Sequence, residues 1–552
     1  MTRIRKTILV ALLAIVGLII GASNYFEINK QLDIFTNIFK EINLYYVDET
    51  QPQELMETAI NSMLESLDPY TNYIRETDVE DFRIQTTGQY GGIGATIRRR
   101  DEKVLIAMPY KGFAAEKAGL KAGDVLLKID DDSLTGLDTE DVSRLLKGSP
   151  GSSFMLTYER DGKVMRDKIT REEVKLKSVP YSGMVAPNIG YIRLSSFTER
   201  ASKDIIDAFE TLKKEHELEG LILDLRNNPG GLLSEAINVS NIFIPKRQEV
   251  VSTRGKVKDW DRTYKTLNQP VDTDIPLVVL INQRSASASE IVSGTVQDLD
   301  RGVVLGQRSF GKGLVQQTRK LSYGAQMKIT ISKYHTPSGR LIQAINYAER
   351  RDDGSVSKVP DSLRMPFNTR NGRVVYDGGG IDPDISLEVQ TTPKILRELV
   401  RNDYIFNYAT QFQRRVNEID EAGVFAISDE EYSNFLVFLE DKEINYETRT
   451  EKIIDELKET ARDEKYFESL EIELNKLKSG FAEKKEADLM TFENDIRQQL
   501  EMEIASRYYF QEGRAAQAIR YDSEIDSAVA ILSNAERYHK ILTPAEEKAS
   551  TE

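Results

Sequence analysis

A serine-rich segment of the chain stands where a nucleophile could be activated. Ser285, Ser287 and Ser289 alternate with alanines between an apolar run at Pro276–Ile281, which predicts a buried strand, and a helical segment that ends near Asp298. A serine at such a strand-to-helix turn places its hydroxyl at the positive end of the helix. Backbone N–H groups there have no intrahelical partner and can hold an oxyanion. The pattern therefore predicts a nucleophilic hydroxyl with oxyanion stabilisation.

A lysine follows in the glycine turn Phe310–Gly313, after a second strand predicted over Gly302–Leu305. A neutral amine can take the proton from a serine hydroxyl, so a serine and Lys312 alone can carry out hydrolysis. The amine must first be desolvated, because an ordinary lysine pKa of about 10.4 leaves it charged at neutral pH. Apolar residues suited to that role flank it: Val303, Val304, Leu305, Phe310, Leu314 and Val315.

These two segments together resemble the C-terminal processing peptidases, which are serine proteases with a Ser–Lys dyad and a PDZ domain. The resemblance is carried by Ser-Ala-Ser-Ala-Ser-Glu at Ser285–Glu290 and by Phe-Gly-Lys-Gly at Phe310–Gly313. It implies that the middle serine, Ser287, is the nucleophile and that Lys312 is its general base. The separation of these two residues matches the spacing in the family.

An earlier part of the same region predicts a layered α/β core. The strand Gly220–Arg226 is followed by a turn at Asn227–Gly231 and a helix, and this order repeats at Ser287. The resemblance implies that the N–H groups of Gly231 and Ala288 form the oxyanion hole. In the alternative interpretation, Gly231 is needed only for a positive φ.

The resemblance also assigns two supporting residues. Gln316 is expected to orient the lysine by a hydrogen bond, and Asp298 to have a minor role near the site. In the alternative interpretation the serines are capping or packing residues and Lys312 is a solvated loop lysine.

A glycine-rich loop near residue 90 predicts a peptide-binding module. Tyr90–Gly94 precedes a strand at Ala95–Arg98, and consecutive N–H groups in such a loop form a nest that suits a carboxylate. A strand edge beside the loop can accept an extended peptide. The segments Ala114–Leu120 and Gly123–Ile129 make this region similar to a PDZ domain, with a helix at Asp138–Leu146 lining the groove. The expected binding residues are Gly91, Gly92, Ile93 and Gly94.

The length of 552 residues and the 40% of hydrophobic residues predict several domains with cores of their own. We expect an α/β multidomain protein. Its parts are a signal anchor or signal peptide at residues 1–26, an N-terminal helical region at 27–85, a PDZ β-sandwich or barrel at 86–177, a serine protease core at 178–390 and a helical C-terminal extension at 391–552.

The N-terminus predicts export. Arg3, Arg5 and Lys6 precede an uncharged run from Thr7 to Phe26, which is long enough to cross a bilayer. The remainder of the chain is then expected outside the cytoplasm, in the periplasm, either anchored to the inner membrane or secreted after cleavage near the small residues Gly21–Ser23.

The composition excludes several classes of function. A net charge of −15 argues against a general nucleic-acid binder. The chain has no cysteine, and its three histidines, His216, His335 and His539, are scattered, so no metal or other cofactor is expected. A Ser-His-Asp hydrolase fits poorly because no G-x-S-x-G elbow is present.

From the resemblance we expect an endopeptidase that cuts extracytoplasmic proteins or peptides near their C-termini. The PDZ domain is expected to capture the C-terminus of the substrate. Two alternatives stay open. One is a PDZ scaffold or adaptor with an inactive protease fold, and the other is a chaperone-like regulator that presents substrates to another protease. A homodimer through the N-terminal helices is a further expectation from the family.

Overall fold

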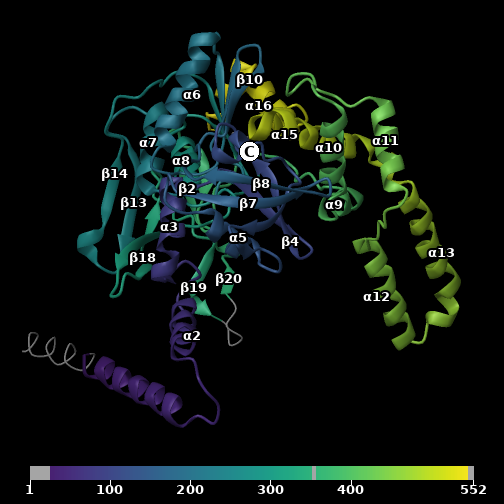
Figure 1. The fold of residues 1–552 in the computed structure, drawn as a ribbon. Helices are drawn as coiled ribbons and strands as arrows, with labels where there is room; N and C mark the ends of the chain where they lie inside the picture. The colour runs from purple at the N-terminus through teal and green to yellow at the C-terminus, as the bar shows by residue number, and fades with distance from the viewer. Residues whose placement is uncertain (1–24, 351–355, 545–552) are drawn as a thin grey trace, which may run out of the picture. The chain divides into compact units, whose positions relative to one another are not determined.

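The computed structural model describes residues 25–350 and 356–544, and it divides into two compact units (Figure 1). The first unit combines the described residues up to Glu76 with Gln316–Thr330. The second unit contains Thr77–Val315 and the chain from Ile331 onward. The second unit therefore holds the PDZ domain, the predicted catalytic segments and the C-terminal helices.

The predicted N-terminal membrane segment lies almost entirely outside the described residues. Only its last residues, Tyr25 and Phe26, are described, and they begin a helix at residues 25–45. Among the residues that the structure describes, no helix has the length and apolar character needed to cross a membrane.

The first unit is mainly helical, as expected, with a small sheet added. Helix α2 (Pro52–Glu65) leads to β1 (Asn72–Ile74), which pairs antiparallel with the first half of β18 (Gln326–His335). Asp68 shapes the turn between α2 and β1, because its Oδ1 accepts the N–H groups of Tyr70 and Thr71 at 2.8 and 2.9 Å.

The PDZ domain is an antiparallel sheet with a helix beside its edge strand. The strand order is β3-β4-β5-β7-β8, so β3 forms one edge. The prediction of a strand after the glycine loop and of a helix from Asp138 is confirmed, with Asp138 as the N-cap of α5. The bounds are β3 (Ala95–Arg100), β4 (Lys103–Pro109), β5 (Val125–Ile129), β7 (Ser153–Arg160), β8 (Lys163–Thr170) and α5 (Thr139–Leu146).

The protease core is built on a six-stranded sheet of order β10-β11-β12-β15-β16-β23, parallel except for β10. The central strands are buried along their whole length, as the continuous apolar runs predict for a parallel sheet covered on both faces. The bounds are β10 (Tyr181–Ala186), β11 (Ile189–Arg193), β12 (Gly220–Asp224), β15 (Leu277–Ile281), β16 (Val303–Gly306) and β23 (Ile385–Ser386).

Helices from distant parts of the chain cover the two faces of this sheet. Helices α6 (Ala201–Glu215), α7 (Leu233–Phe243) and α8 (Ala288–Asp298) cover one face. Helices α16 (Ser523–Leu532) and α17 (Ala535–Ile541) cover the other. The end of the predicted C-terminal extension is thus a layer of the protease core.

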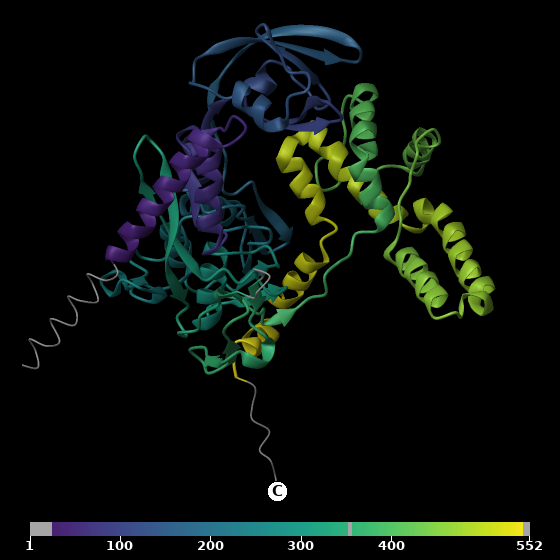
Figure 2. The same cartoon turned by 90° about the horizontal axis from the view of Figure 1, so that it is seen from below.

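The apolar contacts on this second face are extensive. Ile525 and Ile531 of α16 belong to one buried cluster with Ile222, Val278 and Leu280 of the sheet. The neighbouring α17 adds a hydrogen bond to the sheet, in which the hydroxyl of Tyr538 accepts the N–H of Leu277 at 2.9 Å. In Figure 2 the yellow C-terminal segment runs from the helical region to the teal protease core.

The rest of the predicted extension is helical, as expected, and the structure gives it a core of its own. It contacts the PDZ domain: Arg98 of β3 pairs with Asp403 at 2.8 Å and stacks on the ring of Phe406. The bounds are α9 (Lys394–Arg401), α10 (Tyr404–Arg415), α11 (Asp429–Leu439), α12 (Arg449–Asp463), α13 (Phe467–Glu486), α14 (Asp488–Thr491) and α15 (Glu493–Ile519).

Candidate active site

Ser287 is the residue at which the chain turns from the loop after β15 into α8. Its backbone has φ of +55° and ψ of −113°, which is rare for a residue with a side chain and is typical of strained functional turns. The hydroxyls of the flanking serines are buried and occupied: Ser285 donates to the carbonyl of Leu225 at 2.8 Å, and Ser289 to the carbonyl of Asn228 at 2.9 Å. Of the three serines, Ser287 is the partly exposed one.

The buried carboxylate of Glu290 joins the serine segment to the lysine segment. Its Oε2 accepts the N–H of Ser287 at 2.8 Å and the N–H of Lys312 at 2.9 Å. Its Oε1 accepts the N–H of Gly311 at 2.7 Å and the hydroxyl of Ser309 at 2.5 Å. Burial raises the pKa of the Glu290 carboxyl, while these donors favour the ionised form. One side chain therefore fixes the backbones of both predicted catalytic residues.

The ring of Tyr334 makes a second connection between the same two segments. Its hydroxyl lies 2.7 Å from the carbonyl oxygen of Lys312 and 3.1 Å from that of Ser287. The residue is 1% exposed, and its N–H donates to the carbonyl of Gly313 at 2.9 Å. Ser287 and Lys312 are thus held around two shared side chains, Glu290 and Tyr334.

The glycines on either side of Lys312 are required by a close approach of the backbone. A Cβ on Gly311, whose φ is +86°, would lie 2.3 Å from the Cβ of Ala344. A Cβ on Gly313 would lie 2.9 Å from the backbone nitrogen of Gln343. Because real Cβ atoms do not approach so closely, the lysine can be presented in this position only between glycines.

The turn Asn227–Gly231, called the oxyanion turn below, packs directly against Ser287. A Cβ on Gly230 would lie 2.9 Å from the Cβ of Ser287 and 2.9 Å from the backbone nitrogen of Ala288. Within the described part of the chain, the N–H groups of Gly231 and Ala288 donate to no acceptor. Both N–H groups are available for an oxyanion beside the serine hydroxyl.

Asn228 fastens the oxyanion turn to the serine loop. Its Oδ1 accepts the N–H of Gly230 at 2.9 Å, and its Nδ2 donates to the carbonyl of Leu194 at 2.8 Å. Its own carbonyl accepts the N–H of Ala286 at 3.0 Å as well as the hydroxyl of Ser289. The relative position of the turn and the nucleophile is therefore set by hydrogen bonds of a fully buried residue.

Gln316 and Asp298 have other partners in the structure. The amide of Gln316 donates to the hydroxyl of Thr330 at 3.2 Å, and both residues belong to the first unit, so its role toward Lys312 stays a prediction. Asp298 forms an ion pair with Arg340 at 2.7 Å, with both side chains fully buried. This pair makes Asp298 a structural residue of the core behind α8.

In the PDZ domain, the predicted binding loop offers backbone groups. Gly91 and Gly92 lie in β2 (Gln89–Gly92), and the side chain of Ile93 is 3% exposed in the domain core. No described residue accepts the N–H of Ile93 or Gly94, and Gly94 has φ of +70°. A carboxylate would therefore meet the N–H groups of this loop, and a charge placed at Ile93 would disrupt the core before it reported on binding.

The α/β sandwich, its exposed serine turn and the attached PDZ domain define a PDZ-containing serine-type peptidase. The chain matches Peptidase family S41 over residues 188–349, a PDZ domain over 106–160 and the C-terminal helical domain of a probable PDZ-protease over 395–532. The chain belongs to the carboxy-terminal processing proteases, and it is an enzyme rather than the scaffold that the sequence left as an alternative.

Two relatives carry this assignment, and one solved structure is also similar. The chain is 38% identical to the carboxy-terminal-processing protease of Bartonella bacilliformis over 57% of this chain and 73% of the relative. It is 30% identical to a probable CtpA-like serine protease of Staphylococcus aureus N315 over 82% of this chain and 91% of the relative. Among solved structures, the photosystem II D1 C-terminal processing protease is 28% identical, with a TM-score of 0.35, over 65% of this chain and 88% of that one.

Two functional residues were not identified from the sequence. Glu290 stands three residues after Ser287, and this S-x-x-E spacing of a capping box was a local signal for its contact with the Ser287 N–H. Its contacts with Gly311 and Lys312 had no such signal. Tyr334 had none either, because its role depends on the path of β18 beside both segments.

We expect Glu290→Gln to lower kcat by about 100-fold. The substitution should shift the backbones of Ser287 and Lys312, and a displacement of about 1 Å at a reacting group lowers the rate by about that factor. A carboxylate is an acceptor only, whereas one end of a glutamine amide would turn N–H groups toward the donors that Glu290 now satisfies. The measurement is kcat on a short peptide, per active serine, beside thermal unfolding.

The matched control is Glu235→Gln. Glu235 of α7 is 6% exposed and accepts hydrogen bonds from Ser202 and Asn238 within the same core. It should lose stability without a comparable loss of kcat. An equal loss of kcat in both variants would show that Glu290 matters only for folding.

Proposed function

We propose that the protein is an endopeptidase that cuts extracytoplasmic protein substrates near their C-termini with a Ser287–Lys312 dyad. The observation that carries the proposal is the convergence of both residues on Glu290 and Tyr334, beside the unpaired N–H groups of the oxyanion turn and α8.

The reaction follows from the chemistry of these groups. The hydroxyl of Ser287 attacks the peptide carbonyl while the neutral amine of Lys312 takes its proton and passes it to the leaving amine. The N–H groups of Gly231 and Ala288 stabilise the oxyanion, an effect of about 3 kcal/mol per donor. Gln316 orients the lysine, and water then releases the acyl-enzyme.

The PDZ domain supplies the preference for C-termini in this proposal. The open edge of β3 can add an extended peptide as a further strand, with α5 beside it. The N–H groups of Ile93 and Gly94 lie at the start of that strand, where the terminal carboxylate of the peptide would end. Substrates outside the cytoplasm are proposed because basic residues precede the uncharged run Thr7–Phe26.

We expect a peptide with a free C-terminal carboxylate to be cleaved about tenfold more efficiently than the same peptide with a C-terminal amide, since hydrogen bonds to a charged group contribute about 1.5–3 kcal/mol. The measurement is kcat/KM for both peptides with the full chain. Fragment masses locate the cut.

The matched control is a peptide too short to reach from the active site to the PDZ loop, for which acid and amide should be cleaved alike. Equal rates for the long acid and long amide would contradict capture of the carboxylate. Cleavage that persists in Ser287→Ala would contradict the dyad.

A further inference from the structure

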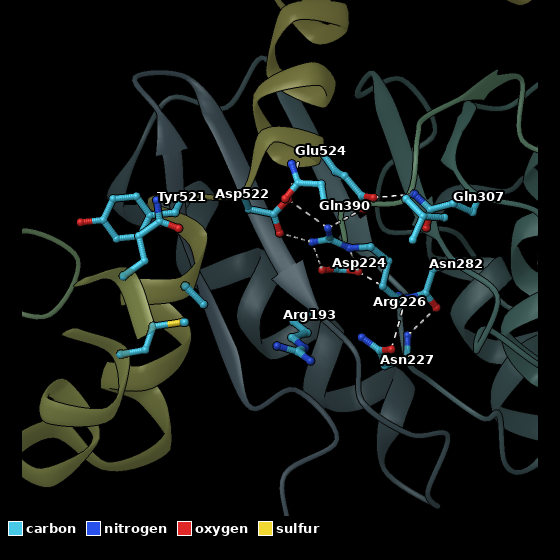
Figure 3. A pocket seen from close by; sticks show the side chains of 14 residues that line it. Arg193, Asp224, Arg226, Asn227, Asn282, Gln307, Gln390, Tyr521, Asp522 and Glu524 are labelled. Carbon is cyan, nitrogen blue, oxygen red and sulfur yellow. Dashed lines mark hydrogen bonds and ion pairs between the residues drawn. The ribbon is translucent and has the colours of Figure 1, made fainter. Parts of the chain in front are cut away.

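An arginine at the base of the oxyanion turn is held by carboxylates from two distant parts of the chain. Arg226 follows β12 and lies in a pocket of about 420 Å³ between the strand ends of the protease sheet and the α15–α16 segment (Figure 3). Its Nη2 lies 2.7 Å from Asp224 of its own strand and 2.8 Å from Asp522, the N-cap of α16. Its Nη1 lies 2.6 Å from Glu524 in the first turn of α16.

Asp224 of this cluster is buried, the other three side chains are partly buried, and the carboxylates accept further hydrogen bonds. The side chains of Arg226 and Glu524 are 13% and 14% exposed. The hydroxyl of Tyr191 donates to Asp224 and the amide of Gln307 donates to Glu524, both at 2.6 Å. Burial acts to raise the pKa of Asp224, but the charge and hydrogen bonds of Arg226, together with the Tyr191 hydroxyl, bring it below its usual value. Because a buried charge without its partner is costly, the cluster ties the start of α16 firmly to the end of β12.

The residues after Arg226 connect this cluster to the nucleophile. The N–H of Asn227 donates to Oδ1 of Asn282 at 3.0 Å, and Nδ2 of Asn282 donates back to Asn227 at 3.2 Å. Oδ1 of Asn282 also accepts the N–H of Arg284, in the loop that leads to Ser287. Asn227 has φ of +61°, in the left-handed region that asparagine adopts more readily than most residues, and these hydrogen bonds hold it there. A displacement of Arg226 would therefore move the oxyanion turn relative to Ser287.

We propose that Arg226, Asp522 and Glu524 are positioning residues for the peptidase reaction, so that α16 takes part in catalysis through the oxyanion turn. The inference rests on the proposed oxyanion hole at Gly231 and Ala288. Oxyanion donors act on the transition state and not on the bound substrate. Loss of their alignment should therefore lower kcat and leave KM unchanged.

The test is the double variant Asp522→Asn, Glu524→Gln in the full chain. Asparagine can keep the N-cap of α16, where Asp522 now accepts the N–H of Glu524 at 3.0 Å, so the fold should persist. Arg226 then keeps only Asp224 as a charged partner. We expect kcat on a short peptide, per serine titrated with a fluorophosphonate, to fall about tenfold to hundredfold with KM unchanged.

A second readout separates positioning from general weakening. A peptide boronate forms a tetrahedral adduct held by the oxyanion hole, whereas an unreactive peptide of the same sequence does not. Affinity for the boronate should fall in proportion to kcat, and affinity for the unreactive peptide should stay at the parental value. A variant that is only less stable would show fewer titratable serines, each with the parental kcat.

The matched control is Glu431→Gln. Glu431 is 12% exposed and pairs with Arg415 inside the helical domain. This variant should keep the parental kcat. If the double variant does not fold, Glu524→Gln alone replaces it. A parental kcat and boronate affinity in either folded variant would overturn the inference, whereas cleavage that survives Ser287→Ala would overturn the proposed function instead.

Discussion

Replacing Ser287 with alanine is expected to abolish peptide cleavage while the protein unfolds at the parental temperature. The loss should be at least about 10⁴-fold, because removal of the nucleophile leaves only binding and the oxyanion hole. Stability should be kept because the bonds from Ser287 to Glu290 and Tyr334 are made by its backbone. The measurements are the rate of release of a fluorescent peptide and thermal unfolding followed by circular dichroism.

The control for this variant is Ser293→Ala, in the same helix. The hydroxyl of Ser293 is buried and donates to the carbonyl of Ser289 at 2.9 Å, so its loss tests packing alone. Lys312→Met extends the test to the base and should be comparably inactive. Parental cleavage by Ser287→Ala would exclude this serine as the nucleophile, and activity in Lys312→Met would point to another base.

Removal of the chain after Asp522 is expected to prevent folding of the protease core. It deletes α16 and α17 and uncovers the sheet face formed by Ile222, Val278 and Leu280. Each large apolar side chain buried there contributes about 1.5–3 kcal/mol to the free energy of unfolding. The helices bring several such residues, and the whole stability of a domain is only about 5–15 kcal/mol. The measurements are solubility, circular dichroism and peptide cleavage.

A chain that ends at Pro544 is the control for this truncation, because it keeps both helices and should fold and cleave as the parent does. Cooperative unfolding of the shorter chain at the parental temperature would show that the sheet tolerates an uncovered face. That outcome would also remove the basis for a role of α16 in catalysis.

The central strands and the catalytic turns could be predicted because their signals are local. The continuous apolar run at Pro276–Ile281 indicated a buried strand, and the glycines around Lys312 indicated a tight turn. The helix predicted over Asp138–Leu146 is α5, for which Asp138 is the N-cap. In each case the physical cause lies within a few residues of the feature.

The remaining features depend on contacts between segments far apart in the chain. The sequence predicted α16 only as part of a helical extension, and nothing in it indicated the protease sheet as the partner of this helix. The reach of Glu290 to Lys312 and the two carbonyls at Tyr334 likewise follow from the tertiary path. Arg226 lies in a largely buried cluster, and two of its carboxylates, Asp522 and Glu524, come from near the other end of the chain.

The placement of α16 and α17 has a consequence for the order of events during synthesis. Every strand of the protease sheet is translated before the helices that cover its second face. When Ser287 and Lys312 have been synthesised, the nascent chain still lacks α16 and α17, the helices that cover the second face of the sheet. If the core needs α16 and α17, as predicted above, the oxyanion turn becomes ordered only after the residues beyond Asp522 have been made. We therefore expect a ribosome-bound chain to gain peptidase activity only once these helices have been made.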